Sequence, residues 1–322
     1  MIRYEREKEN MTTRKKWTIA LIAFLTVIAI GVAGGSFYLY HFAFEPTPKV
    51  LNHSSSKSKS KLKQNQAWLK RVNKQTWHET SATDHLKLVA DYVPAAHRTT
   101  KTIIVAHGYM GNKEQMASYI RLWHRQGYNV LAPDDRGNGQ SQGDYYGFGW
   151  PDRLDYLKWT RQVIRRVGQN SQIGLFGVSM GGATVMMMSG EKLPSQVKAI
   201  IEDCGYTSVG DELGYELNQL YHLPKFPLLY TASWVAQAKA HFNFMTASSV
   251  NQLKKNKLPI FFIHGAKDTF VPTKMVYQNY RATTVKSKQL WVAPGAGHAE
   301  SYTRYPQLYQ QKVSQFMAKY LK

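Results

Sequence analysis

The sequence has 322 residues, 43% of them hydrophobic, which suffices for the core of one large domain with accessory segments. It has a single cysteine, Cys204, which excludes an intramolecular disulfide and a cysteine-based zinc site. The net charge is +21, and residues 64–322 contain 31 Lys and Arg against 17 Asp and Glu. Such a basic field favours anionic surroundings such as lipid headgroups or cell-wall polymers. No recognisable nucleic-acid-binding module accompanies the charge, so no nucleic-acid partner is expected.

A long apolar segment predicts a transmembrane helix over residues 17–44. None of these 28 residues is charged, with His41 counted as neutral, and about 20 apolar residues suffice to cross the hydrocarbon core. Trp17 lies at one end and Tyr38 and Tyr40 lie near the other, as expected of aromatic anchors at membrane interfaces.

Basic residues on either side of this segment bear on its orientation. Six precede it and five follow it up to residue 63, but Arg14-Lys15-Lys16 adjoins it directly. By the positive-inside rule, residues 1–16 are predicted to be a cytoplasmic tail of a single-pass cell-membrane protein whose remaining domain is extracellular. A cleaved signal peptide is the alternative, because Gly31-Val32-Ala33 offers small residues. We favour an uncleaved anchor, since the apolar run continues well past that point.

Residues 45–66 are predicted to be a disordered linker. Pro46 and Pro48 interrupt regular structure, and the Ser/Lys-rich stretch 54–61 has no hydrophobic pattern. We interpret it as a solvated stalk, with a contact to anionic cell-wall polymer or lipid as the alternative.

Beyond residue 66, short apolar runs alternate with helical patterns, which predicts an α/β domain over residues 67–322. Continuous apolar runs are typical of strands buried on both faces of a mostly parallel, doubly wound sheet. The expected strands are 86–93, 102–106, 128–132, 172–176, 199–202, 259–264 and 289–292. The expected helices are 113–126, 150–167, 183–189, 273–280 and 305–321. Residues 206–257 break the alternation and predict a short helical cap, whose aromatic side chains either line an acyl pocket or pack helices together.

The sequence Gly177-Val178-Ser179-Met180-Gly181 lies between an expected strand and an expected helix. A nucleophile elbow requires small residues around its serine, because a strained strand-to-helix turn projects the hydroxyl. The helix N-terminus also favours developing negative charge. Ser179 is therefore the predicted nucleophile, and a Gly/Ser-rich helix start without catalysis is the alternative.

A serine nucleophile needs a base, and the base needs an acid that orients it; in this kind of sheet they follow in the order Ser, Asp or Glu, His. Asp268 follows the strand expected at 259–264, and His298 lies in the glycine-rich loop after the next strand. We predict that they complete a triad with Ser179. Asp203 is the second candidate for the acid, and His264 is expected to be structural because it precedes the acid.

The predicted oxyanion hole consists of the backbone N–H groups of Tyr109 and Met180. Tyr109 lies in the loop after the strand expected at 102–106, and Met180 follows the nucleophile. The Tyr109 hydroxyl is a further candidate to bind substrate. This chemistry requires neither a metal nor a cofactor, and none is expected.

Four blocks resemble the α/β-hydrolase superfamily: His107-Gly108, Asp135-Arg136-Gly137-Asn138-Gly139-Gln140-Ser141, the Ser179 elbow, and Asp268 with His298. They span residues 102 to 301. The chain looks similar to bacterial membrane-anchored cell-surface serine hydrolases, related to the acyl esterases and the serine aminopeptidase-like group. The resemblance implies an α/β-hydrolase fold in which Asp135 and Arg136 brace the loop beneath the site and take no part in the chemistry.

Together these residues predict a serine hydrolase that cleaves acyl esters through an acyl-enzyme, a carboxylesterase acting on a small-molecule or envelope-derived acyl substrate. A serine peptidase or amidase is the alternative, because Asp211, Glu212 and Glu216 in the cap offer partners for a substrate amine. We expect these acidic residues to lie on a solvated helix face. A non-catalytic binding module is the third interpretation, and the complete triad argues against it.

Overall fold

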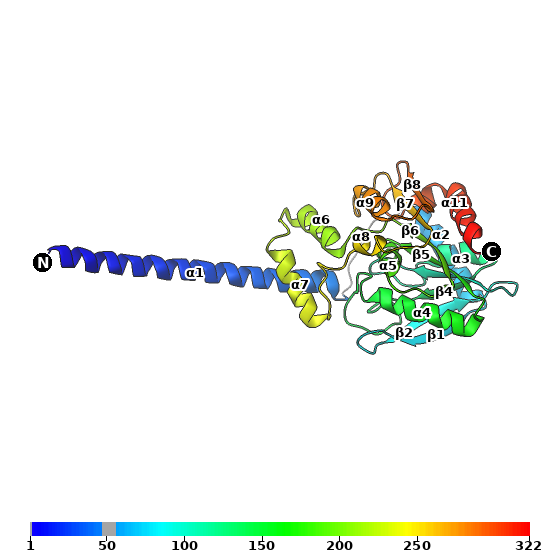
Figure 1. The fold of residues 1–322 in the computed structure, drawn as a ribbon, viewed down its shortest axis with the longest axis horizontal. Coiled ribbons are helices and arrows are strands. Elements are labelled where there is room, and N and C mark those ends of the chain that lie inside the picture. Colours follow the sequence, from blue (N-terminus) through cyan, green and yellow to red (C-terminus); the bar gives the residue numbers. More distant parts are fainter. Residues whose placement is uncertain (1, 47–55) are drawn as a thin grey trace.

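The computed structural model describes residues 2–46 and 56–322, with side chains from residue 12 to 46 and from residue 60 onward. Its centre is an eight-stranded sheet in the order β1-β2-β4-β3-β5-β6-β7-β8 (Figure 1). The first two strands join antiparallel, and every pairing from β4 to β8 is parallel. The strands are β1 (Gln75–Thr80), β2 (Lys87–Val93), β3 (Lys101–Ala106), β4 (Asn129–Pro133), β5 (Gln172–Val178), β6 (Val197–Asp203), β7 (Ile260–Gly265) and β8 (Lys288–Ala293).

Helices cover both faces of this sheet, which confirms the predicted fold class. Successive residues of β3 point to opposite faces, so Ile103 joins the core under α2, α3 and α11, whereas Ile104 joins the core under α4, α5, α8 and α9. The covering helices are α2 (Ser56–Arg71), α3 (Ala117–Arg125), α4 (Asp152–Val167), α5 (Met180–Met188), α8 (Ser249–Leu253), α9 (Lys274–Ala282) and α11 (Pro306–Tyr320), and α10 (Ser301–Arg304) is a single short turn. All seven expected strands are present.

Strand β1 was not expected from the sequence. It lies at the sheet edge, and Trp77 is its only buried residue. A strand with one buried side chain in six residues has no apolar run or alternation to identify it.

The region expected to be a cap contains α6 (Val209–Tyr221) and α7 (Leu228–Lys239), followed by α8. In Figure 1, α6 and α7 stand away from the sheet on the side from which the N-terminal helix approaches. Helix α7 lies beside the C-terminal part of α1, so the cap and the end of that helix meet at the same side of the domain.

Helix α1 (Ile2–Phe44) is continuous over its whole length and projects away from the domain (Figure 1). Its segment Thr12–Phe44 is long and apolar enough to cross a membrane, a criterion that an N-terminal signal sequence also meets. Its last turns differ from the rest, since Ser36, Tyr40 and Phe44 are buried. Their spacing of four residues places them on one helix face, which packs against α7 and the core cluster that contains Phe148 and Met180.

Helix α2 corrects the prediction of a disordered linker over residues 45–66. Residues 47–55 lie outside the described residues, but the chain is helical from Ser56 onward. Asn65 receives a hydrogen bond from Arg121 on α3 and donates one to Ser118. Leu69 is buried in the core. The prediction was wrong because this segment starts with lysines and serines, and the apolar face of the helix begins only at Leu62.

If α2 belongs to the folded domain, Leu69→Ala should lower the free energy of unfolding of the full chain by about 2–5 kcal/mol, the usual effect of removing a buried leucine. Lys70→Ala is the matched control, because Lys70 is exposed on the same helix. Urea denaturation in detergent measures both. Equal stability of the two variants would mean that α2 is only a spacer.

Candidate active site

Ser179 occupies a sharp turn between β5 and α5. Its backbone has φ 58° and ψ −118°, a left-handed φ that is strained for a residue with a side chain. A Cβ on Gly181 would lie 2.2 Å from the Ala106 carbonyl oxygen, and a Cβ on Gly177 would lie 2.0 Å from the Gly181 carbonyl oxygen. Only glycine fits at either position, as a nucleophile elbow requires. The Ser179 N–H donates to the Asp203 carbonyl at 2.8 Å, which ties the turn to β6.

The structure brings the three side chains of the predicted triad into one hydrogen-bonded chain. His298 Nε2 lies 2.9 Å from Ser179 Oγ, and His298 Nδ1 lies 2.8 Å from Asp268 Oδ2. A carboxylate accepts from Nδ1–H, which leaves Nε2 to accept the serine proton. This is the geometry that a general base needs in order to activate a hydroxyl.

Asp268 is held as an anion. Burial raises its pKa, but hydrogen bonds from His264 and His298 outweigh this effect and lower the pKa to about 2. Its Oδ1 also accepts the backbone N–H groups of Phe270 and Val271 at 3.0 and 2.9 Å. His264 is fully buried, and its Nε2 lies 2.9 Å from the Val271 carbonyl and 3.3 Å from Asp268 Oδ2. It supports the Asp268 loop from below, in keeping with a structural role.

Asp203, the second candidate for the acid, faces another partner. Its Oδ2 accepts a hydrogen bond from the Tyr309 hydroxyl at 2.8 Å, and burial raises its pKa to about 6. Neither of its side-chain oxygens bonds to His298 among the described contacts. Geometry therefore favours Asp268 as the group that orients the imidazole.

Cys204, Asp268 and His298 place one ligand-type atom each within 4.8 Å of one another. Both ring nitrogens of His298 already have partners in Asp268 and Ser179. Burial raises the pKa of the Cys204 thiol well above its ordinary value, which opposes the thiolate that a metal requires. Asp268 and His298 therefore fit a proton-transfer chain with Ser179 better than a metal centre with Cys204.

His107 fixes the peptide that carries one predicted oxyanion donor. The Asp135 N–H donates to His107 Nε2 at 2.9 Å, so the ring proton is on Nδ1, which donates to the Gly108 carbonyl at 2.8 Å. Burial lowers the pKa of His107, which keeps the ring neutral. In a trans peptide the Tyr109 N–H points opposite to that carbonyl. Because a Cβ on Gly108 would lie 3.5 Å from Ser179 Cβ, this peptide lies beside the nucleophile.

The second predicted donor is the Met180 N–H. Met180 is the first residue of α5, and the first N–H groups of a helix have no intrahelical partner. The Tyr109 hydroxyl, a candidate for substrate binding, donates instead to the Ala43 carbonyl of α1 at 2.6 Å. The proton of this hydroxyl is therefore used in the contact with α1 and is not offered to a substrate.

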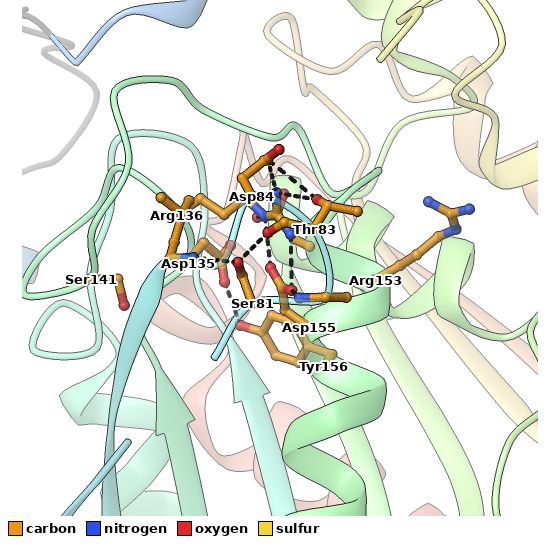
Figure 2. A network of polar contacts seen from close by, with 12 residues as sticks. Ser81, Thr83, Asp84, Asp135, Arg136, Ser141, Arg153, Asp155 and Tyr156 are labelled. Carbon is orange, nitrogen blue, oxygen red and sulfur yellow. Dashed lines mark hydrogen bonds and ion pairs between the residues drawn. The ribbon is translucent and has the colours of Figure 1, made fainter. Parts of the chain in front are cut away.

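Arg136 forms the centre of a buried polar network behind the site (Figure 2). Its guanidinium binds Asp155 in a bidentate manner, with Nε–Oδ2 and Nη2–Oδ1 distances of 2.7 and 2.9 Å, and its Nη1 contacts Asp84 and Tyr145 at 2.8 and 2.9 Å. Bidentate pairing of this kind compensates the desolvation of a buried charge. The bracing implied for Arg136 is thus visible as contacts that fix the loop after β4.

Asp135 is the neighbouring acid in this network, and no Lys or Arg among the described residues contacts its carboxylate directly. The Tyr156 hydroxyl donates to its Oδ1 at 2.8 Å, while its Oδ2 has no hydrogen-bond partner among the described residues (Figure 2). Burial raises the pKa of Asp135 to about 8 and that of nearby Asp152 to about 7. Both carboxyl groups therefore stay protonated at pH values well above those at which a carboxyl group ordinarily ionises.

Ser179 and His298 lie at the wall of a cavity of about 730 Å³ whose lining is mostly apolar. Three elements contribute most of its walls: the last turns of α1, helix α6 and the loop after β7. The α1 residues are Leu39, Phe42, Ala43 and Phe44. Sequence reasoning assigned this helix to the membrane alone. Its length could have indicated this second role, because its apolar run is several residues longer than the approximately 20 residues that a helix needs to cross a bilayer.

The cap acids Glu212 and Glu216 also line this cavity, which corrects their expected place on a solvated helix face. Glu212 is 4% exposed, and neither of its carboxylate oxygens has a partner among the described residues. Burial raises the pKa of Glu212 well above its ordinary value and also raises that of Glu216. Asp211, in contrast, accepts a hydrogen bond from Lys225 at the helix surface.

Comparison with known proteins agrees with the α/β fold described above. A profile of the prolyl oligopeptidase family matches residues 114–322, more than half of the chain. The uncharacterized protein YqkD of Bacillus subtilis is 29% identical over 232 residues, which are 71% of this chain and 75% of YqkD. The uncharacterized protein YfhR of Escherichia coli K12 is 24% identical over 249 residues, which are 74% of this chain and 79% of YfhR.

Two solved structures share the fold. The esterase Pf2001 of Pyrococcus furiosus aligns with a TM-score of 0.63 at 23% identity, over 85% of this chain and 99% of that protein. The acylaminoacyl peptidase of Pyrococcus horikoshii aligns with a TM-score of 0.57 at 18% identity, over 80% of this chain and 44% of that protein. An esterase and a peptidase thus have the same architecture as this chain.

The contacts of the two candidate acids lead to a first prediction for this site. Asp268→Asn should lower kcat by about 10⁴-fold, because an amide does not hold the tautomer that leaves Nε2 free to accept a proton. Asp203→Asn should change kcat far less, since Asp203 bonds to Tyr309. Steady-state ester hydrolysis compares the two. A larger loss in Asp203→Asn would transfer the role of the acid to Asp203.

The raised pKa of Asp135 predicts a pH-dependent stability. In the folded protein this carboxyl keeps its proton up to a pH of about 8, whereas its ordinary pKa is 3.8. Between these limits the folded state binds more protons than the unfolded chain, so the free energy of unfolding falls as pH rises. Asp268 has the opposite sign, but its contribution changes only below its ordinary pKa of 3.8.

Asp135→Asn should therefore reduce the fall in the free energy of unfolding across this pH range. Urea titrations at several pH values between the two limits measure the slope. Asp144→Asn is the control, because Asp144 is exposed. An unchanged slope in Asp135→Asn would mean that Asp135 is ionised in the folded protein.

Proposed function

The chain belongs to the prolyl oligopeptidase family and is a serine hydrolase with the α/β-hydrolase fold, and from this premise we propose that it is a carboxylesterase. The observation that supports this proposal most is the hydrogen-bonded chain Ser179–His298–Asp268 at the wall of a large apolar cavity. An apolar cavity fits the acyl part of an ester, because acyl chains offer nothing to hydrogen-bond.

The proposed mechanism uses only groups of this chain and water. His298 Nε2 takes the proton of Ser179 as Oγ attacks the ester carbonyl carbon, and Asp268 stabilises the imidazolium through Nδ1–H. The oxyanion receives hydrogen bonds from the N–H groups of Tyr109 and Met180. His298 then gives its proton to the departing alkoxide, which leaves as an alcohol. Water, deprotonated by His298, attacks the acyl-enzyme, and His298 returns this proton to Ser179 Oγ as the carboxylic acid leaves.

A serine peptidase or amidase is the second candidate, and the cap acids favour it. Glu212 and Glu216 line the same cavity as Ser179 and His298. Among the described residues, Glu212 has no hydrogen-bond partner for either carboxylate oxygen. A substrate ammonium group placed between the two glutamates would supply one. Such a substrate would lower the pKa of Glu212 on binding, since an adjacent positive charge favours the ionised carboxyl.

We further propose that α1 is an uncleaved membrane anchor and that the catalytic domain lies at the cell surface. Support comes from the length and apolar composition of α1 and from the basic cluster Arg14-Lys15-Lys16, which directly precedes its apolar segment. A membrane-impermeant fluorophosphonate should then label the protein on intact cells. Labelling that appears only after lysis would place the domain inside.

Covalent labelling tests the nucleophile directly. A fluorophosphonate should label the folded wild-type protein, and Ser179→Ala should abolish both labelling and p-nitrophenyl ester hydrolysis. Ser189→Ala is the matched control, because Ser189 lies at the other end of α5. Failure of the folded wild type to react would favour a non-catalytic binding module.

The two cap acids separate the esterase from the peptidase. For an esterase, Glu212→Gln and Glu216→Gln should leave hydrolysis of neutral esters within about threefold, because an amide keeps the size of the side chain and removes only its charge. For a peptidase they should raise KM for aminoacyl amides by about tenfold or more, as expected when a buried ion pair is lost. Cleavage of amides without turnover of esters would decide for the peptidase.

A further inference from the structure

The apolar span of α1 continues directly into the residues that contact the folded domain, with no spacer between them. Residues 17–35 make up nineteen helical residues, about 28 Å at 1.5 Å per residue, and the hydrocarbon core is about 30 Å thick. A Cβ on Gly35 would already lie 2.9 Å from Leu228 of α7. The next residue, Ser36, is 1% exposed and its hydroxyl lies 2.6 Å from that of Thr231. A bilayer around residues 17–35 therefore reaches the cap itself.

The surface of the cap beside α1 is apolar. Phe226 and Trp234 are 72% and 67% exposed, unusually high for large aromatic side chains. Both line a groove of about 710 Å³ together with Ile28 and Val32 of α1. Since these α1 residues belong to the span that would lie in hydrocarbon, the two aromatic side chains lie at the depth of lipid chains.

The catalytic cavity extends along the same end of α1. Close to the nucleophile, Tyr109 holds the Ala43 carbonyl, and one turn back toward the membrane Leu39 still lines the cavity. At this far end Tyr38 and Tyr221 share a hydrogen bond of 3.0 Å between their hydroxyls, and Leu220 and Tyr221 complete the wall at the end of α6. The cavity thus runs from Ser179 between α1 and α6 toward the side of the domain that faces the bilayer.

We infer that the substrate is an acyl lipid that enters this cavity directly from the membrane, with α1 serving both as anchor and as one wall of the acyl pocket. The inference rests on the proposed esterase function and adds its substrate class. The acyl chain lies between α1 and α6, and its carbonyl carbon reaches Ser179. Hydrolysis consumes one water and releases a fatty acid, while the alcohol part of the lipid takes the proton from His298.

A proteoliposome assay tests the inference with the full chain. The bilayer is ether-linked phosphatidylcholine, which has no ester bond, and the probe is dioleoylglycerol in the same vesicles. Wild-type protein should release oleate. Replacing Phe226 and Trp234 together by serine should lower this rate by about tenfold, because the variant loses apolar side chains that hold the cavity mouth in lipid. Hydrolysis of water-soluble p-nitrophenyl butyrate should be unchanged.

Tyr277→Ser is the matched control, because Tyr277 is an exposed aromatic residue on α9, away from α1 (Figure 1). It should leave both rates unchanged. Butyrate turnover without oleate release by the wild type would overturn the lipid substrate and leave the esterase proposal intact. Equal loss of both activities in the Phe226/Trp234 variant would also overturn it. Absence of both activities and of fluorophosphonate labelling would refute the esterase proposal itself.

A second measurement locates the cap without reference to activity. A nitroxide on Trp234→Cys should be more accessible to dissolved oxygen than to a water-soluble nickel complex, as in hydrocarbon. A nitroxide on Tyr277→Cys should show the reverse. Native Cys204 is fully buried and does not compete for the label. Preferential nickel access at both positions would place the cap in water and exclude entry from the bilayer.

Discussion

A helix that ends inside a protein leaves backbone carbonyls that need hydrogen-bond donors. At the end of α1 two such donors come from the loops after β3 and β4: the Tyr109 hydroxyl binds the Ala43 carbonyl, and the Tyr146 N–H binds the Phe44 carbonyl at 2.8 Å. Tyr109 is also the residue whose N–H is expected to face the oxyanion. The end of the apolar helix and the catalytic loop are therefore held by one residue, so the position of α1 and the geometry of the site are not independent.

The interior behind the site is organised by charges that are either fully paired or neutralised. Arg136 is fully buried, and its bidentate contact with Asp155 is supplemented by Asp84. Among the described residues, the Tyr156 hydroxyl alone donates a hydrogen bond to the Asp135 carboxyl, and burial raises its pKa to about 8, so that it stays protonated and uncharged below that pH. Asp268 is the contrasting case, because two histidines and two backbone N–H groups keep it ionised. Two environments thus give aspartates opposite states within one fold.

Much of the central sheet could be predicted from the sequence, because strands buried on both faces are short, continuous apolar runs. The order of Ser179, Asp268 and His298 along the chain also indicated which side chains would meet, since the carboxyl ends of parallel strands share one edge of the sheet. Both inferences rely on local patterns that the fold leaves unchanged.

The features that were missed depend on contacts between distant segments. Helix α2 shows its apolar face only against α3, and Glu212 is buried only because α6 turns toward the cavity. The end of α1 has the composition of a membrane span, so composition alone cannot reveal that Leu39 and Ala43 face a cavity. Tertiary contacts overrode local patterns in each case.

The same contacts bear on whether α1 is retained. Cleavage after Ala33 would keep Ser36, Tyr40 and Phe44 in place, so the cavity wall and the Tyr109 contact would survive it. It would remove Ile28 and Val32, which form one side of the groove that contains Phe226 and Trp234. Those two aromatic side chains would then face water beside a severed helix, an arrangement that costs apolar solvation and favours aggregation. A retained helix in lipid would give both residues an apolar environment, which supports the proposal that α1 is an uncleaved anchor.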